Sequence, residues 1–240
     1  MQSSIKVTNL KKSYGTKEAV KNINFEIKEN EIIGLLGPNG SGKTTTIGMI
    51  LGLLKPTSGE VLINGLKIEK NPIEILQKIN FISPYIELPK KLTVKQNLIV
   101  YGKLYSVKKI NEKIDYLVSK LRLDNLLNRV TGELSSGQKN RISLAKAIIN
   151  DPSVLLLVEP TASLDPEIGD FVRTFLENYK KEKKVSILLA SHNMDEVTRL
   201  CSSIMMMKNG LIIDQGKPSD LIKKHGRKNL EEVFLKLARN

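Results

Sequence analysis

The segment "EIIGLLGPNGSGKTTTIGMI" spans residues 31 to 50 and combines a short apolar run, a glycine-rich turn and a run with helical spacing. The apolar run is typical of a strand that is buried on both faces of a sheet. Glycines let successive backbone N–H groups of the turn point inward, and the N-terminus of the following helix adds the positive end of its dipole. The segment therefore predicts a phosphate-binding loop between a strand and a helix.

The glycine-rich turn fits the spacing G-x-x-x-x-G-K-S/T, in the strand-to-helix context that this pattern requires. Its lysine, Lys43, is expected to reach the β- and γ-phosphates of a nucleotide, and the hydroxyl of Thr44 is expected to bind Mg²⁺. The expected cofactors are therefore ATP and Mg²⁺. The loop residues expected to bind the nucleotide are Gly37, Pro38, Asn39, Gly40, Ser41, Gly42, Lys43, Thr44 and Thr45.

Strand and helix patterns alternate on both sides of this loop. The first thirty residues show the period-2 alternation of two antiparallel strands around a turn at residues 12–19. Residues 92 to about 130 show amphipathic helical spacing, and apolar strand runs resume at 153–158 and 185–191. The pair Asn209-Gly210 predicts the turn of a further hairpin.

These patterns predict an α/β fold, namely a P-loop NTPase core with an N-terminal antiparallel β subdomain and an α-helical insertion subdomain. We expect residues 1–240 to form one domain. Its parts are residues 1–83 (β subdomain and phosphate-binding part of the core), 84–145 (helical subdomain), 146–225 (rest of the core) and 226–240 (C-terminal helix).

Length and composition fit a globular protein, because 240 residues with 40% hydrophobic content can bury a sizeable core. No apolar run reaches the ~18 residues of a membrane-spanning helix, and the N-terminus lacks the apolar centre of a secretory signal. We therefore expect the chain to stay in the cytoplasm. The single cysteine, Cys201, excludes a disulfide framework and is expected to be a small buried residue.

The formal net charge is +13, from 38 Lys and Arg against 25 Asp and Glu. This charge favours an anionic partner such as a nucleotide, a nucleic acid or a lipid surface. Scattered lysines that keep a domain soluble would give the same total. No basic stretch is interleaved with aromatic residues, so base stacking is not indicated and no nucleic acid partner is expected.

Three further motifs follow in a fixed order: "LSSGQ" at 134–138, "LLLVEPTASLD" at 155–165 and "ASHNMDE" at 190–196. With the glycine-rich turn, they resemble the ATP-binding subunits of ABC transporters over most of the chain. The turn is similar to that family's Walker A motif, and the three segments are similar to its signature, its Walker B with D-loop, and its switch-histidine segment. "NLEEVFLKL" near the end resembles the tail of ATPases that serve ABC-2 type exporters.

The resemblance implies roles for individual residues. Glu159 would polarise the attacking water, His192 would contact the γ-phosphate with Lys43 beside it, and Tyr14 would stack on adenine. Without the resemblance, the same residues also fit simpler roles. Glu159 fits a surface turn, His192 a polar residue at a strand end, and Tyr14 an aromatic residue of a hairpin.

The resemblance also implies partners. In this family two ATP-binding subunits face each other head to tail, as a homodimer or a heterodimer, and each completes the site of the other. Ser135, Gly137 and Gln138 would bind the ATP of the second subunit and Asp165 would cross the interface, although Asp165 also fits a simple helix cap. The insertion from about Pro84 to residue 130 would dock on a transmembrane permease subunit, at the cytoplasmic face of the cell membrane.

The chain departs from the family at the strand end where the Walker B motif normally reads Asp-Glu, because it has Val158 before Glu159. Mg²⁺ then depends on Thr44, phosphate oxygens and water. Losing such a second-shell metal partner typically costs ~10 to 100-fold in metal affinity or activity. Taken as a strand residue only, Val158 suits a buried strand.

Two more departures follow. An alignment without gaps puts Pro84 where the family has its Q-loop glutamine. Tyr85 and Glu87 are the candidates to reach into the site instead, and the alternative is that this alignment is shifted by a residue or more. Ser136 replaces the first glycine of the signature pair, which would affect the site of the partner.

We therefore expect a slow or partly degenerate ABC-type ATPase that powers export through a separate membrane subunit. The alternatives are a regulatory nucleotide-binding subunit that does not hydrolyse ATP, and a soluble ABC-type ATPase that acts on nucleic acid or the ribosome.

Overall fold

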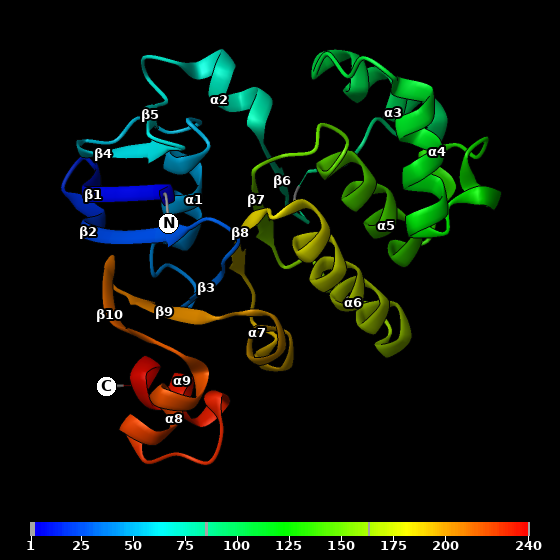
Figure 1. Cartoon of the computed structure of the whole chain (residues 1–240). Coiled ribbons are helices and arrows are strands. Elements are labelled where there is room, and N and C mark those ends of the chain that lie inside the picture. Colours follow the sequence, from blue (N-terminus) through cyan, green and yellow to red (C-terminus); the bar gives the residue numbers. More distant parts are fainter. Residues whose placement is uncertain (1–2, 85, 163, 240) are drawn as a thin grey trace.

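The computed structural model describes residues 3–84, 86–162 and 164–239. Two β-sheets and a set of helices make up the fold (Figure 1). The strands are β1 (Ser3–Tyr14), β2 (Lys17–Lys28), β3 (Ile32–Leu36), β4 (Ser58–Ile63), β5 (Leu66–Lys67), β6 (Ile79–Ile82), β7 (Val154–Val158), β8 (Ser186–Ala190), β9 (Ser203–Lys208) and β10 (Leu211–Gly216). The α-helices are α1 (Lys43–Ile50), α2 (Pro72–Lys78), α3 (Val94–Leu104), α4 (Ile110–Leu121), α5 (Ser136–Ala147), α6 (Pro166–Lys183), α7 (Met194–Leu200), α8 (Pro218–His225) and α9 (Leu230–Arg239), with short 3-10 turns at Asp124–Leu126 and Thr131–Glu133.

The central sheet has six strands in the order β10-β9-β3-β8-β7-β6. Its neighbours pair in parallel except for β10, which runs antiparallel to β9. The inner strands β3, β7 and β8 are almost entirely apolar and buried, as expected where both faces of a sheet are covered, whereas the edge strand β10 alternates between exposed and half-buried residues. In β7, for example, Leu155 and Leu157 face one core while Val154 and Leu156 face the other.

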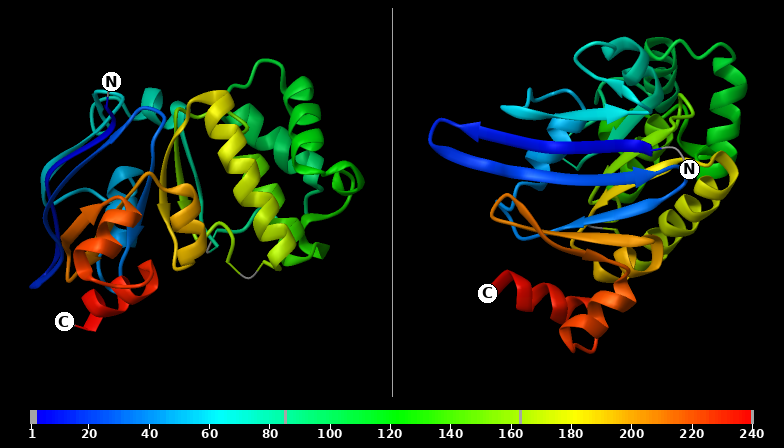
Figure 2. Two further views of the ribbon diagram at one scale, coloured as in Figure 1. Left: turned by 60° about the horizontal axis from the view of Figure 1, so that its bottom comes forward. Right: turned by 60° about the vertical axis from the view of Figure 1, so that its left-hand side comes forward.

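The second sheet is antiparallel, in the order β2-β1-β4-β5, and shares a core with one face of the central sheet. Helix α1 contributes to that core, and its residues from Thr46 to Ile50 are all buried. Helices α3 to α6 lie on the opposite side of the central sheet (Figure 1, Figure 2). The central sheet is therefore the layer between the β subdomain and the helical part.

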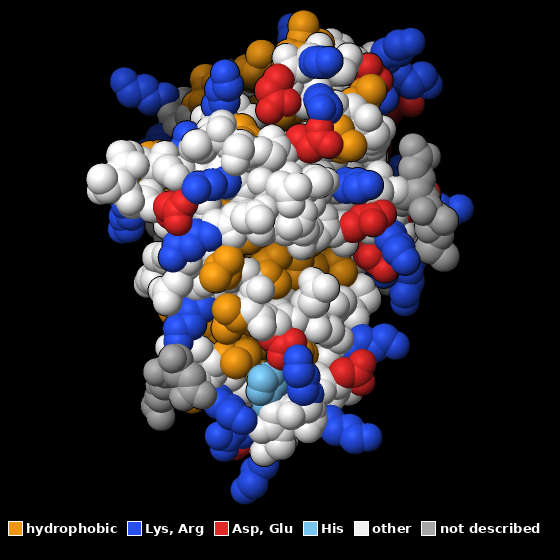
Figure 3. Space-filling view, turned by 90° about the vertical axis from the view of Figure 1, so that its left-hand side faces the viewer, with side chains coloured by type: hydrophobic (Ala, Val, Ile, Leu, Met, Phe, Trp, Pro, Cys, Tyr) orange, Lys and Arg blue, Asp and Glu red, His pale blue; other side chains and the backbone are white. Residues whose placement is uncertain are grey.

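The basic side chains do not form one stripe on the face that Figure 3 presents, where they are scattered among acidic, apolar and neutral groups. That distribution suits the solubilising role of lysines considered above. None of the helices in the described part of the chain is both long and apolar enough to span a bilayer.

The α/β fold with its antiparallel subdomain and helical insertion is confirmed. The predicted hairpin at Asn209-Gly210 is also confirmed, since both residues have the positive φ of a tight hairpin turn, 50° and 80°. Helix α1 is shorter than the helical pattern over residues 43–54 predicts. It ends at Ile50 because Gly52 has a φ of 70°, the left-handed conformation that terminates helices.

Lys146 on α5 joins three elements between the central sheet and the helical part. Its amine donates hydrogen bonds to the Asn80 side chain at 3.2 Å and to the Phe81 carbonyl at 3.1 Å, both on β6. The amine also lies 4.7 Å from the ring centre of Phe81 and 5.5 Å from that of Tyr101 on α3. Burial lowers the pKa of Lys146 to about 8.

This low pKa predicts a pH-dependent stability. Between pH 8 and the pKa of ~10.4 for an unfolded lysine, the folded protein binds fewer protons at Lys146 than the unfolded chain does. Relative to Lys146→Met, the wild type should therefore gain stability as the pH rises from 8 to 10. Melting temperatures at several pH values measure this difference, and Lys95→Met on the exposed face of α3 measures the effect of removing a surface charge. A constant difference between wild type and Lys146→Met would refute the prediction.

Candidate functional site

The phosphate-binding loop lies between β3 and α1, and its glycines are required by close packing. A Cβ on Gly37 would run into the backbone carbonyl oxygen of Met207 on β9. Gly42 has a φ of 109°, and a Cβ there would lie 2.6 Å from the carbonyl oxygen of Ala19. Gly40 also has a positive φ, 78°, which favours glycine. The loop is therefore held against both β2 and β9.

The turn between β9 and β10 supports the loop from behind. The N–H of Gly210 donates to the carbonyl of Ser41 at 2.9 Å, and the carbonyl of Gly210 accepts from the N–H of Lys21 at 2.7 Å. The Asn-Gly pair predicted a hairpin, but no local pattern indicated this contact with a segment some 170 residues away. The turn connects the antiparallel sheet, the central sheet and the loop.

A cavity of about 490 Å³ opens beside the loop. It is lined by Tyr14, Lys17, Glu18, Ala19, Lys21, Asn39, Gly40, Ser41, Gly42, Lys43, Thr44, Thr45 and Asn209. Tyr14 is 49% exposed, and the Lys12 amine lies 5.1 Å from its ring centre. Three lysines and a loop of backbone N–H groups suit a polyphosphate with an aromatic base.

Lys43 faces the carbonyl side of the loop. Its amine donates to the carbonyl of Gly37 at 2.6 Å and to that of Pro38 at 3.2 Å. Burial lowers the pKa of Lys43, while the negative charge of Glu159 opposes that shift. The Lys43 cation therefore lies close enough to Glu159 for their charges to interact.

Glu159 and His192 meet at the carboxyl ends of the neighbouring strands β7 and β8. The N–H of His192 donates to Glu159 Oε2 at 3.2 Å, and His192 Nε2 lies 3.6 Å from Glu159 Oε1. Glu159 has a φ of 50°, an unfavourable conformation for this residue type, and its N–H donates to the carbonyl of Ala190 at 2.8 Å. Glu159, expected to polarise the attacking water, and His192, expected to contact the γ-phosphate, therefore lie side by side.

Val158, which stands where the resembled family has an aspartate, lies in apolar surroundings. Val158 is half-buried, pairs with Ala190 across the sheet and packs against the core beneath the loop. Among residues 3–84, 86–162 and 164–239, no three His, Cys, Asp or Glu side chains cluster as a metal site would require. Thr44 has an exposed side chain and is the residue that would supply a protein oxygen. The donor set fits Mg²⁺ only as part of a shell completed by phosphate and water.

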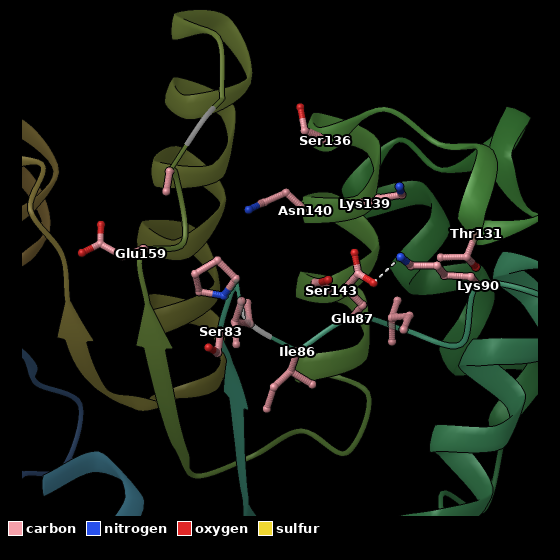
Figure 4. Close-up of a pocket in the computed structure, with 14 residues that line it drawn as sticks. Ser83, Ile86, Glu87, Lys90, Thr131, Ser136, Lys139, Asn140, Ser143 and Glu159 are labelled. Atoms are coloured by element: carbon pink, nitrogen blue, oxygen red, sulfur yellow. Dashed lines mark ion pairs between the residues drawn. The ribbon is translucent and has the colours of Figure 1, made fainter. Parts of the chain in front are cut away.

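A second cavity, of about 250 Å³, separates the Glu159 loop from α5 (Figure 4). Pro84 lines it, together with Ile86, Lys139 and Thr131. Figure 4 shows Glu87 directed toward Lys90, with which it forms an ion pair of 2.6 Å, and Glu159 on the opposite side of the cavity. Glu87 therefore does not replace the missing glutamine in this arrangement, and Tyr85 lies outside the described residues.

The start of α5 is fixed by a reciprocal pair of hydrogen bonds. The hydroxyl of Ser135 accepts from the N–H of Gln138 at 3.3 Å, and the Gln138 side chain accepts from the N–H of Ser135 at 3.1 Å. Gly137 is next to Ile168 at the start of α6, where Asp165 caps the helix by accepting from the Ile168 N–H at 2.9 Å. Asp165 thus has the helix-capping contact that the sequence alone allowed.

The residues expected to act on a second subunit lie away from the phosphate-binding loop of their own chain. They are Ser135, Gly137, Gln138 and Asp165. Among the described residues, neither residues 135–138 nor Asp165 lines the cavity at the phosphate-binding loop. Ser135 and Asp165 are exposed. They are thus available to another molecule. Farther along α5, the side chain of Asn140 donates to the carbonyl of Pro160 at 2.6 Å and connects the helix to the Glu159 loop.

Comparisons with known proteins agree with this geometry. The family model described as ABC transporter matches residues 20–162. The bacitracin transport ATP-binding protein BcrA of Bacillus licheniformis is 37% identical over 234 residues, which cover 96% of this chain and 75% of that protein. A Nod factor export ATP-binding protein I from Rhizobium sp. is 34% identical, over 96% of this chain and 76% of that protein.

Solved structures are similar over almost the whole chain. An ATP-binding subunit of an ABC transporter has a TM-score of 0.90 with 25% identity, and the match covers 98% of this chain and 99% of that one. A dimeric ATP-binding cassette in a post-hydrolysis state, bound to ADP and Pi, has a TM-score of 0.81 with 27% identity, over 89% and 98% of the two chains.

The packing of the loop predicts the effect of one added methyl group. Gly37→Ala should force the loop away from Met207, at ~1–3 kcal/mol of strain, and weaken ATP binding by about tenfold or more. Fluorescence titration with a labelled ATP analogue measures the affinity. Gly65→Ala is the control, because Gly65 has a φ of 79°, open space around it and no contact with the cavity residues, so it should lower the melting temperature without changing the affinity. Unchanged affinity in Gly37→Ala would contradict the packing argument.

Proposed function

The chain belongs to the ABC transporter family, and from this membership we propose that it is the ATP-binding subunit of an exporter, which hydrolyses ATP slowly and drives a separate transmembrane subunit. The observation that carries the proposal is the meeting of Glu159 and His192 at one edge of the central sheet, within reach of the charge of Lys43. A phosphate-binding loop alone would serve many nucleotide-binding proteins. A carboxylate and an imidazole beside it suit hydrolysis.

Nucleotide binding follows from the loop and its cavity. The backbone N–H groups of residues 39–45 and the amine of Lys43 stabilise phosphate charge, and Tyr14 offers a ring to the base. Lys43 exchanges its contacts with the loop carbonyls for contacts with phosphate oxygens. This exchange keeps the half-buried cation paired throughout.

Hydrolysis requires a positioned water molecule and stabilised charge, since phosphoryl transfer asks for little covalent chemistry from the protein. The Glu159 carboxylate accepts a hydrogen bond from that water, and the His192 side chain, 47% exposed, turns toward the terminal phosphate. Mg²⁺, when bound, neutralises phosphate charge, and Thr44 is the protein group that would hold it. Val158 offers no oxygen at the usual second position, which is why we propose slow turnover.

A second ATP-binding subunit completes the site. Ser135, Gly137 and Gln138 lie at a helix N-terminus that can accept a terminal phosphate, and they are away from the loop of their own chain. This separation supports the head-to-tail arrangement, in which each subunit supplies its signature residues and Asp165 to the other. A similar cassette, bound to ADP and Pi, is dimeric. The second subunit is either a copy of this chain or a different ATP-binding subunit.

The partner in the membrane is a permease that carries the substrate. The relatives named for bacitracin transport and Nod factor export support the export class, not either substrate. We propose that residues 84 to 130 dock on the permease and hold the chain at the cytoplasmic face of the membrane. The transported molecule is bound by the permease.

One alternative is favoured by a specific observation. Val158 and Pro84 both remove polar groups from the same edge of the sheet, so the chain also fits a regulatory subunit that binds ATP without hydrolysing it.

The residue before Glu159 provides the decisive test. We expect low ATPase activity in the wild type and a gain of ~10 to 100-fold in Val158→Asp, because a carboxylate returns to the edge of the site. The Mg²⁺ concentration that gives half-maximal activity should fall in the same variant. Phosphate release measured across a Mg²⁺ titration reports both changes. Val158→Asn has nearly the same shape as the aspartate without its charge, and it should stay slow.

Other outcomes distinguish a slow ATPase from a regulatory subunit that does not hydrolyse ATP. Fast turnover of the wild type, or no difference between Val158→Asp and Val158→Asn, would count against a weakened magnesium site. ATP binding without turnover in any of the three would favour the regulatory subunit. Glu159→Gln should abolish turnover in every background and retain ATP binding.

Membrane association tests the partner. The chain, tagged and expressed in its own host, should copurify from detergent-solubilised membranes with a protein that has several hydrophobic spans. Recovery with RNA instead, lost progressively as salt is raised, would support the nucleic acid reading and oppose the transporter.

A further inference from the structure

Glu196 on α7 is a carboxylate in the interior of the protein. Its side chain is 0% exposed, and neither oxygen forms a hydrogen bond of good geometry with a described residue. A buried carboxylate is costly unless it is neutral or paired. No local pattern indicates this burial, because "NMDE" is a polar segment typical of an exposed helix start.

The start of α7 fixes where Glu196 points. The side chain of Asn193 accepts from the N–H of Glu196 at 3.0 Å, and the hydroxyl of Ser191 accepts from the N–H of Asn193 at 3.1 Å. These two caps set the first turn of the helix. His192 precedes α7, whose N-cap is Asn193, and is exposed, whereas Glu196 in the first turn of the helix is directed to the inside.

Two hydroxyl groups, one on each of the loops that carry Glu159 and His192, influence the Glu196 carboxyl. Ser191, 1% exposed, directly precedes His192, and Thr161, 7% exposed, follows Glu159 by two residues. Burial raises the pKa of Glu196, the hydroxyls of Ser191 and Thr161 lower it by a smaller amount, and the charges of Glu159 and Arg173 act in opposite directions. The net shift is upward, which favours the neutral acid.

A neutral carboxylic acid can join two hydroxyl groups, because its O–H donates to one while its other oxygen accepts from the second. Direct hydrogen bonds also join the described residues of the two loops. The N–H of Glu159 donates to Ala190, and the N–H of His192 donates to Glu159. The second of these bonds, at 3.2 Å, is on the surface and depends on the two loops keeping their separation.

We infer that Glu196 is a positioning residue, whose buried side chain links Thr161 to Ser191 and thereby keeps the Glu159 carboxylate in contact with His192. Its importance for turnover rests on the proposed function, whereas its effect on the contact does not. Glu196 does not touch the nucleotide. It acts through the two loops.

The experiment compares Glu196→Gln with Glu196→Ala in the full chain. The amide of glutamine both donates and accepts, so Glu196→Gln should keep the link, while Glu196→Ala removes it. Hydrogen exchange of the His192 amide, measured without nucleotide, reports the contact with Glu159 directly. Exchange should become about tenfold faster in Glu196→Ala, the equivalent of a ~1.4 kcal/mol loss, and stay within about twofold in Glu196→Gln.

Two controls keep the test independent of folding. Asp195→Ala removes the neighbouring, exposed carboxylate of the same helix and should leave exchange at His192 unchanged. Thr161→Val removes the other end of the link with little change in volume, and it should accelerate exchange at His192 even where Glu196→Ala does not fold.

The outcomes are separable. Unchanged exchange in both Glu196→Ala and Thr161→Val, or equal acceleration in Glu196→Gln and Glu196→Ala, would overturn the inference. Turnover is easiest to measure in Val158→Asp. In that variant, adding Glu196→Ala should lower kcat about tenfold with unchanged ATP affinity. Adding Glu196→Gln in its place should leave kcat close to that of Val158→Asp alone. Loss of the contact without any measurable turnover in any variant would count against the ATPase proposal and not against the role of Glu196.

Discussion

The close approach of the phosphate-binding loop to β9 is the constraint on which the rest of the site depends. Gly37 has no side chain, so the loop can leave β3 against the carbonyl oxygen of Met207, and Gly42 allows the same approach to Ala19 on β2. Through these two contacts the loop is fixed to both sheets at once. Any side chain at Gly37 would separate elements that lie far apart in sequence but must meet for the cavity to exist.

The order of the central sheet brings the chemistry together. Strands β3, β8 and β7 are neighbours and run in parallel, so the loop, His192 and Glu159 emerge at the same edge. The same strand order places both apolar substitutions at this edge. Val158 and Pro84 leave the adjacent strands β7 and β6 at this edge, so two positions that could supply oxygen atoms to a metal shell are apolar in the same region. The weak magnesium site that we propose is therefore compatible with an intact phosphate-binding loop.

Much of the fold could be predicted because the signals are local. The buried strands are continuous apolar runs, and the Asn209-Gly210 turn has a sequence signature of its own. The contacts that complete the site are not local. The bond from Gly210 to Ser41 joins segments that no periodicity connects, and the burial of Glu196 follows from how two caps orient α7. The end of α1 at Ile50 was missed for a different reason, since apolar spacing continued past the glycine that stops the helix.

The capped start of α5 has a consequence for how molecules meet. Ser135 and Gln138 hold each other in a closed pair of hydrogen bonds within the single chain, so this turn is already ordered before anything approaches it. An incoming surface then meets a rigid template. Association at this end of the molecule does not have to restrict a mobile loop, and the entropy that such ordering costs in other complexes was lost earlier, when the chain folded.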